Sequence, residues 1–132
     1  MKRLILVCAI LANTLLAPAA TPSPRDEVKK LCDSWFSQFG FESVLRCRQA
    51  ASTGVVRICV RAYRDLEGQL RCMQAADEEV VRTCIKAWED WEGQLSCMLG
   101  KSAAIVKKCI RKYGDRESQL LCIRYSQAED DV

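Results

Sequence analysis

The chain has 132 residues, with 20 basic side chains, 17 acidic ones, nine cysteines, no histidine and a formal net charge of +3 at pH 7. So small a basic excess argues against nucleic-acid binding, because neutralising phosphates needs many more cations than anions. The absence of histidine excludes the usual serine and cysteine triads, and with no C-x-x-C pair it also argues against a bound metal.

The first twenty residues have the layout of a secretory signal peptide. Lys2 and Arg3 precede an apolar run over residues 4–16, and small residues up to Ala20 provide a cleavage site. An uncleaved membrane anchor is the alternative, although the run is shorter than the ~20 residues that a spanning helix needs. We therefore predict that this segment is removed and that the protein is secreted and extracellular, with no transmembrane segment.

The cysteines that remain after cleavage number eight, beside 18 basic and 17 acidic side chains. An even count in a secreted chain predicts four disulfides and no free thiol. The first two cysteines are further apart than the others, whose separations alternate between 12 and 13. Two successive separations add up to a period of about 25 residues, which is typical of a repeat protein. The positions are Cys32, Cys47, Cys59, Cys72, Cys84, Cys97, Cys109 and Cys122.

The period divides the chain into four copies of one module, and each copy is predicted to be a helical hairpin. We expect a linker at residues 21–25, a single domain at 26–126 and an acidic tail at 127–132. The predicted fold class is all-α, with four tandem disulfide-stapled hairpins in a short array or a closed bundle. The repeats span residues 26–50, 51–75, 76–100 and 101–126.

The first helix of each repeat is indicated by apolar residues at helical spacing. In the third repeat, Val80, Cys84 and Trp88 fall at i, i+4 and i+8 and form one apolar face. An aromatic residue at about this place in every copy is expected to pack against the disulfides, and a stacking platform for a ligand is the alternative. These aromatic residues are Trp35, Tyr63, Trp88 and Tyr113. The predicted N-caps, seven residues before a cysteine, are Ser52, Asp77 and Ser102.

The second helix of each repeat is predicted to begin at a capping aspartate, with a glutamate in its first turn that complements the helix dipole. In the third repeat these residues are Asp90 and Glu92, and Leu95, Cys97 and Met98 form the buried face. The corresponding residues elsewhere are Asp65 and Glu67, Asp115 and Glu117, and Glu42. At the chain reversals, Gly40 and Gly114 are expected to adopt a positive φ.

Both helices of a hairpin are only about three turns long, so they are marginal alone in water and need cross-links. Antiparallel helices about 8–10 Å apart bring facing Cα atoms to roughly 4–5.5 Å, which a disulfide can span. The favoured scheme pairs Cys32–Cys47, Cys59–Cys72, Cys84–Cys97 and Cys109–Cys122. The alternative joins neighbouring repeats as 47–59, 72–84 and 97–109 and leaves 32 and 122 to pair.

The repeats do not suggest a catalytic site. Catalysis needs an asymmetric set of residues, whereas a residue that recurs in every module serves as a cap, a core contact or a cross-link. The repeated glutamates are therefore assigned to the helix dipole rather than to acid/base chemistry, and no glycine-rich phosphate loop is present. We predict no enzymatic activity, no catalytic or metal-binding residue and no cofactor.

Basic residues at i, i+4 on the first helix of three successive repeats are the candidate binding residues. Stacking of the repeats would align them into a basic ridge that suits an extracellular protein or an anionic surface, such as an acidic receptor face, a sulfated glycan or lipid headgroups. The alternative is ion pairing with acidic residues of adjacent helices. Trp91, which has no counterpart in the other copies, is a candidate interface anchor. The basic ridge comprises Arg57, Arg61, Arg82, Lys86, Lys107 and Arg111.

The segment CIRKYGDRESQLLC, at residues 109–122, is similar to helical segments of the con-ikot-ikot toxins of cone-snail venom. The shared features are a C-x3-Y pattern, a following glycine and an Arg-Glu pair before the next cysteine, whereas the adjacent cysteine pairs of those toxins are missing from this chain. The resemblance implies a helical binder of ionotropic glutamate receptors. Cysteine-paired hairpins of the mitochondrial intermembrane space are also similar, but they use C-x9-C and carry no secretory signal.

Together these features predict a secreted, disulfide-rich helical protein that binds an extracellular macromolecular partner. Stacked repeats provide an extended surface, which suits protein recognition. The first alternative is a venom or defence toxin that acts on a receptor, an ion channel or a membrane. The second alternative is a carrier of a small ligand or pheromone.

Overall fold

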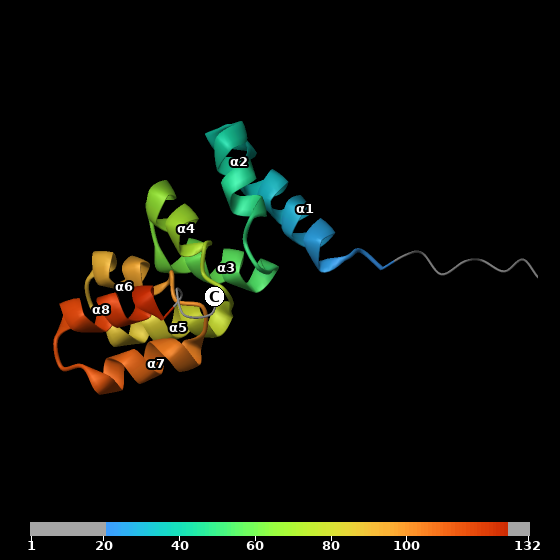
Figure 1. Ribbon diagram of the computed structural model, residues 1–132. Coiled ribbons are helices and arrows are strands. Elements are labelled where there is room, and N and C mark those ends of the chain that lie inside the picture. The colour runs from blue at the N-terminus through green and yellow to red at the C-terminus, as the bar shows by residue number, and fades with distance from the viewer. Residues whose placement is uncertain (1–20, 127–132) are drawn as a thin grey trace, which may run out of the picture.

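The computed structural model describes residues 21–126 and contains, over that range, eight α-helices and one short 3-10 helix (Figure 1). The predicted signal peptide and acidic tail lie outside the described residues. The α-helices pair into four hairpins, numbered 1 to 4 along the chain. Their bounds are α1 Pro24–Phe36, η1 Ser37–Phe39, α2 Phe41–Arg48, α3 Thr53–Ala62, α4 Leu66–Cys72, α5 Glu78–Ala87, α6 Trp91–Cys97, α7 Ala103–Lys112 and α8 Arg116–Tyr125.

The hairpins stack side by side as a two-layered array. Each odd-numbered helix contacts the next, so α1, α3, α5 and α7 form one layer, and the even-numbered helices form the other in the same way (Figure 1). The main helix contacts all lie within one hairpin or between adjacent hairpins, which makes the arrangement an array and not a closed bundle. Among residues 21–126, hairpins 1 and 4 therefore have a neighbouring hairpin on one side only. Within residues 21–126, no helix combines the length and hydropathy needed to cross a membrane.

The predicted aspartate and serine caps begin the helices. Asp90 accepts a hydrogen bond from the amide of Gly93 at 2.9 Å, and Asp115 accepts one from the amide of Ser118 at 2.9 Å. The hydrogen bond from Ser118 holds the pKa of Asp115 below its usual value. The same cap forms at Ser52, Asp65, Asp77 and Ser102.

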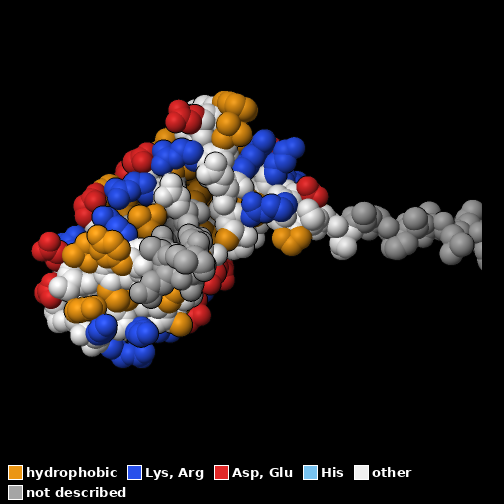
Figure 2. Space-filling view, in the orientation of Figure 1, with side chains coloured by type: hydrophobic (Ala, Val, Ile, Leu, Met, Phe, Trp, Pro, Cys, Tyr) orange, Lys and Arg blue, Asp and Glu red, His pale blue; other side chains and the backbone are white. Residues whose placement is uncertain are grey.

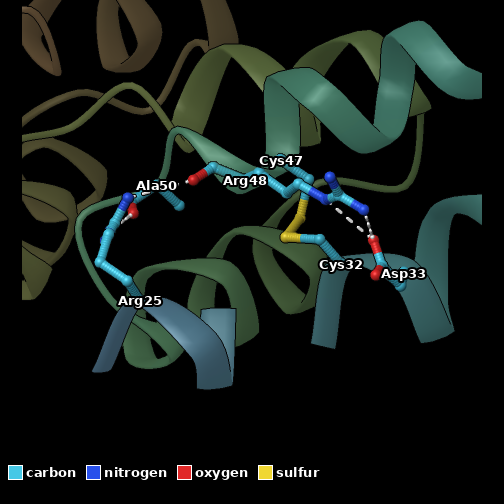
Figure 3. The surroundings of a disulfide bond; sticks show 6 residues. All are labelled: Arg25, Cys32, Asp33, Cys47, Arg48 and Ala50. Atoms are coloured by element: carbon cyan, nitrogen blue, oxygen red, sulfur yellow. Dashed lines mark hydrogen bonds and ion pairs between the residues drawn. A yellow bond between two sulfur atoms is a disulfide. The ribbon is translucent and has the colours of Figure 1, made fainter. Parts of the chain in front are cut away.

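The first helix begins earlier than expected, at Pro24, inside the segment predicted to be a linker. Ser23 caps it, and proline suits the first turn because its fixed φ is helical and its missing amide hydrogen is not needed there. Arg25 donates hydrogen bonds to the carbonyl oxygens of Arg48 and Ala50 (Figure 3). The start of α1 is therefore tied to the end of hairpin 1.

Each hairpin contains its own disulfide. The four Cα–Cα separations are 5.5 to 5.6 Å, within the range that a disulfide can span. Beside the Cys32–Cys47 disulfide, the Arg48 Nε donates to Asp33 at 2.9 Å (Figure 3). The favoured pairing is confirmed and the alternative between neighbouring repeats is wrong. Four disulfides indicate an oxidising compartment.

A glutamine of the second helix closes the bend in hairpins 2 to 4. In hairpin 3, the Gln94 Nε2 donates to the carbonyl oxygen of Trp88 at 2.7 Å. This hydrogen bond satisfies a carbonyl at the end of the first helix, where intrahelical donors run out. The equivalent bonds, both 2.8 Å long, join Gln69 to Tyr63 and Gln119 to Tyr113.

The two glycines at predicted reversals differ. Gly40 has a φ of +96° between η1 and α2, which confirms the expectation for the longer bend of hairpin 1. The positive φ expected for Gly114 is wrong, because the bend between α7 and α8 leaves the helix through extended backbone, with a φ of −118° at Tyr113. Arg64 and Glu89 occupy the same place in hairpins 2 and 3, so this bend does not require glycine.

The buried aromatic position of hairpin 1 belongs to Phe36 and not to Trp35. Phe36 follows the first cysteine of its repeat by four residues, the spacing of Tyr63 and Trp88, and all three side chains are buried. Residues four apart lie on one helix face, whereas Trp35 is rotated away and only half-buried. Packing of the aromatic residues into the core is therefore confirmed for Tyr63 and Trp88, and Trp35 lies at the edge of that core.

Ion pairs join adjacent hairpins along the even-numbered layer. Arg46 donates to both carboxylate oxygens of Glu67, at 2.8 and 2.9 Å, and Arg71 lies 3.3 Å from Glu92. The bidentate hydrogen bond lowers the pKa of Glu67 and raises that of Arg46. The series ends where Ser96 replaces the arginine in the third repeat. Basic and acidic side chains alternate accordingly along the edge over α2, α4 and α6 (Figure 2). Two of the repeated glutamates thus also connect hairpins.

Tyr63 connects hairpins 2 and 3 and allows a test by pH. Its hydroxyl donates to the Gln94 Oε1 at 2.9 Å, and burial raises the pKa of Tyr63 from 10.0 to about 12, although Arg71 opposes the shift. The folded state therefore holds this proton more tightly than the unfolded state, so the stability that it contributes is complete below pH 10 and is lost as the pH rises towards 12. We expect an absorbance titration of phenolate to show a step near pH 12 that Tyr63→Phe lacks. A native protein without that step would contradict the buried hydroxyl.

Candidate partner-binding surface

The basic ridge lies on three adjacent helices of the odd-numbered layer. α3 contacts α5, and α5 contacts α7, so the structure brings the three basic pairs onto neighbouring helices. All six side chains are exposed. The pairs are Arg57 and Arg61 on α3, Arg82 and Lys86 on α5, and Lys107 and Arg111 on α7.

The first residue of each pair has a partner inside the molecule. The partners are Trp35 for Arg57, at 5.4 Å from the ring centroid, Glu78 for Arg82 at 3.7 Å and Glu79 for Lys107 at 3.0 Å. Exposed ion pairs of this kind are worth at most about 1 kcal/mol each. The predicted alternative, ion pairing with an acidic residue of an adjacent helix, applies to Lys107, because Glu79 belongs to α5.

The second residue of each pair remains available. Arg61, Lys86 and Arg111 form no hydrogen bond or ion pair with any residue between 21 and 126. Each stands in the last turn of its helix, where a cation is favoured by the helix dipole but needs no side-chain partner. The three recur once per repeat, at the same position of successive odd-numbered helices. Their charge is thus free to attract an external anion.

Trp91 lies on the other layer, at the start of α6, and the structure does not bring it together with the basic ridge. Its ring packs edge-on against Tyr63, with 6.4 Å between centroids, and lies 5.8 Å from the guanidinium of Arg71. Gly68 leaves room for the ring, because a Cβ there would lie 3.1 Å from the Trp91 Nε1. Trp91 is still 39% exposed, so it both joins hairpins 2 and 3 and remains a predicted partner contact.

Two hollows of about 420 Å³ lie between hairpins 1 and 2. One is lined by Lys30 and Arg57 beside Glu27, and the other includes Trp35 and Phe39. Both are open to solvent, so they extend the exposed surface rather than enclose a ligand. The candidate site is accordingly the ridge itself.

The residues that sequence reasoning missed are the arginines that connect the hairpins. Arg46 and Arg71 each stand directly before the second cysteine of their repeat and 21 residues before the glutamate that they bind. That recurring spacing is a visible signal in the sequence. It becomes interpretable only once the hairpins are known to stack in register.

Comparison of the chain with protein-family models, with curated proteins and with solved structures finds no match. The function proposed below therefore depends on the charge, exposure and arrangement of the surface residues.

Proposed function

We propose that this protein is a secreted binding protein whose basic ridge recognises an anionic extracellular macromolecule. The observation that carries the proposal is the row formed by Arg61, Lys86 and Arg111, exposed on successive helices without a partner among residues 21–126. A row of like charges raises the local concentration of an oppositely charged partner and its rate of association. The four disulfides support secretion, because disulfides persist in oxidising compartments.

Binding to heparin, a linear sulfated glycan, tests this proposal. We expect an affinity that falls as salt rises, because the attraction between exposed charges is screened. Replacing Arg61, Lys86 and Arg111 together by alanine should weaken binding and reduce the slope of log affinity against log salt by about two to three, since each neutralised anion contributes about 0.7–0.9.

The matched control replaces three other exposed cations, Lys29, Arg64 and Arg124, by alanine. This variant has the same net charge as the ridge variant, so it should retain heparin binding if the row matters. Equal loss in the two variants would show that binding follows net charge, and salt-independent or absent binding would reject the ridge altogether. Anionic vesicles in a parallel titration distinguish a lipid surface from a glycan. The toxin and carrier alternatives remain predictions, which dye leakage from vesicles and native mass spectrometry would test.

A further inference from the structure

The contact made by Trp91 shows what hairpin 2 binds on its forward side, the side that faces the next hairpin in the chain; hairpin 3 instead receives Arg116, which pairs with Asp90 at 2.7 Å. Trp91, the first residue of α6, packs against hairpin 2. Its ring lies against Tyr63, Gly68 and Arg71. In hairpin 3 this first residue is followed by Glu92, which pairs with Arg71 at 3.3 Å. The bound element is therefore the acidic start of a helix with an aromatic anchor.

The same three positions in hairpin 4 line an open hollow. Fifty residues after the first set stand Tyr113, Ser118 and Leu121, which together with Cys122 and Tyr125 surround about 320 Å³. Leu121 is 41% exposed and Tyr125 is 65% exposed. We name this set of five residues the terminal hollow.

The burial of the second cysteine of each repeat supports the equivalence between the terminal hollow and the surface of hairpin 2 that contacts Trp91. In hairpins 1 to 3 this cysteine is 0% exposed, whereas Cys122 is only half-buried. Among the described residues, hairpin 4 has no following hairpin to cover it. The terminal hollow therefore corresponds to the surface that, in hairpins 1 to 3, is buried against the following hairpin.

Two basic residues lie beside the terminal hollow. Lys108 and Lys112 line a neighbouring hollow of about 230 Å³ that shares Tyr113, Cys122 and Tyr125 with the first. Residues 101–126 carry seven basic and two acidic side chains, so the whole fourth repeat is strongly positive. Hydrophobic side chains lie over α6 and α8, with basic ones beside them over α7 (Figure 2). An occupant should therefore combine an apolar anchor with negative charge.

A second copy of the chain fits this surface less well. Its first hairpin would present Phe41, which is 74% exposed and begins α2 as Trp91 begins α6. In the odd-numbered layer, lysines of the two copies would then repel each other. Lys29 stands three residues before the first cysteine of its repeat, a position occupied in the other repeats by the buried residues Val56, Val81 and Val106. Lys108 stands directly before the first cysteine of the fourth repeat, where the other repeats have Leu31, Ile58 and Thr83. Continuing the array would bring these two lysines towards each other, so both ends of this layer oppose further stacking.

We propose that the terminal hollow binds a partner helix whose first turn is acidic and carries an aromatic or leucine anchor. The anchor would lie between Tyr113 and Leu121, as Trp91 lies between Tyr63 and Arg71. Because Ser118 stands where hairpin 2 has Gly68, the anchor would lie further from α8 than Trp91 lies from α4. Lys108 and Lys112 would attract the carboxylates of the partner.

A synthetic peptide of residues 87–98, AWEDWEGQLSCM with Cys97→Ser, is the probe, because it contains the segment that fills the internal counterpart. We expect NMR titration of the oxidised protein to shift the signals of Tyr113, Leu121 and Tyr125. A control peptide with Trp91→Ala keeps the charge and should bind roughly tenfold more weakly or worse, the loss typical of an interface anchor. Equal binding of the two peptides would overturn the proposal.

Protein variants locate the site. Leu121→Glu should abolish the shifts, whereas Leu99→Glu, at a similarly exposed leucine between α6 and α7, should not. The double alanine variant of Arg61 and Lys86, which leaves the charge of the fourth repeat unchanged, should bind the peptide as the native protein does, and this separates the site from the basic ridge. Shifts confined to the ridge would overturn the proposal. So would peptide binding only after removal of residues 127–132, or self-association abolished by Phe41→Ser, because the chain itself would then fill the hollow.

Discussion

Replacing Cys84 and Cys97 together by alanine should lower the free energy of unfolding by about 3 kcal/mol. The disulfide closes a segment with a sequence separation of 13 residues and joins α5, of 10 residues, to α6, of 7. Helices of that length do not persist alone in water, so the hairpin depends on other stabilisation. The cross-link provides it by limiting the conformations open to the unfolded chain. Urea unfolding followed by circular dichroism, with the native protein under the same non-reducing conditions, measures the loss.

The Cys109–Cys122 pair provides the control for position. Its sequence separation is also 13 residues, so the chain-entropy effect of removing it is the same. Within the part of the chain that the structure describes, hairpin 4 has one neighbouring hairpin and hairpin 3 has two, so the first variant should also weaken the contacts of hairpins 2 and 4. We therefore expect the Cys84/Cys97 variant to be the less stable of the two. An unchanged urea midpoint in both variants would contradict the role given to the disulfides.

Met98→Ala should destabilise the protein by about 2–5 kcal/mol, the range for truncating a fully buried methionine to alanine. Met98 follows α6 directly and is 1% exposed within the main core cluster. Its truncation removes apolar contacts and leaves a cavity that the surrounding core side chains can fill only in part. Thermal or urea unfolding gives the change in free energy.

The next residue is a matched control. Leu99 is 48% exposed, so Leu99→Ala should change stability by no more than about 0.5 kcal/mol. Similar losses at the two positions would mean that Met98 does not lie in the core as described. A loss confined to Met98 would confirm that hairpin 3 buries the residue directly after its second cysteine.

The features that sequence reasoning predicted correctly are those that each repeat specifies locally. The caps at Asp90 and Asp115 depend on the chemistry of three or four consecutive residues, and the disulfides depend on two helices of known length meeting at one bend. Four copies of the pattern allow each inference to be checked against the others. The fold class and the cysteine pairing could therefore be predicted from local chemistry and covalent geometry.

The errors arose where the first and last repeats depart from the others. In the first repeat Trp35 was chosen for its residue type, although Phe36 stands at the four-residue spacing after the first cysteine that the other repeats share. Gly114 suggested a tight reversal, although the equivalent bends are built by Arg64 and Glu89 without one. In both cases the composition of a single copy was weaker evidence than the spacing shared by all.

The candidate binding surface could be predicted only in part. Helical spacing placed Arg61, Lys86 and Arg111 on equivalent faces, and stacking of the odd-numbered helices places them on one side of the molecule. Which cations would be paired depended on side chains from neighbouring hairpins, such as Glu79 beside Lys107. Contacts of that kind follow from the register between repeats, which the period alone does not give.

Each of the four disulfides among residues 21–126 lies inside one hairpin, which affects how such a chain can change length. Duplicating or deleting one whole repeat leaves each cysteine with its own mate, so no bond elsewhere must be exchanged. A descendant with three or five units would oxidise by the same local pairings. The architecture therefore lets evolution vary the reach of the molecule one module at a time.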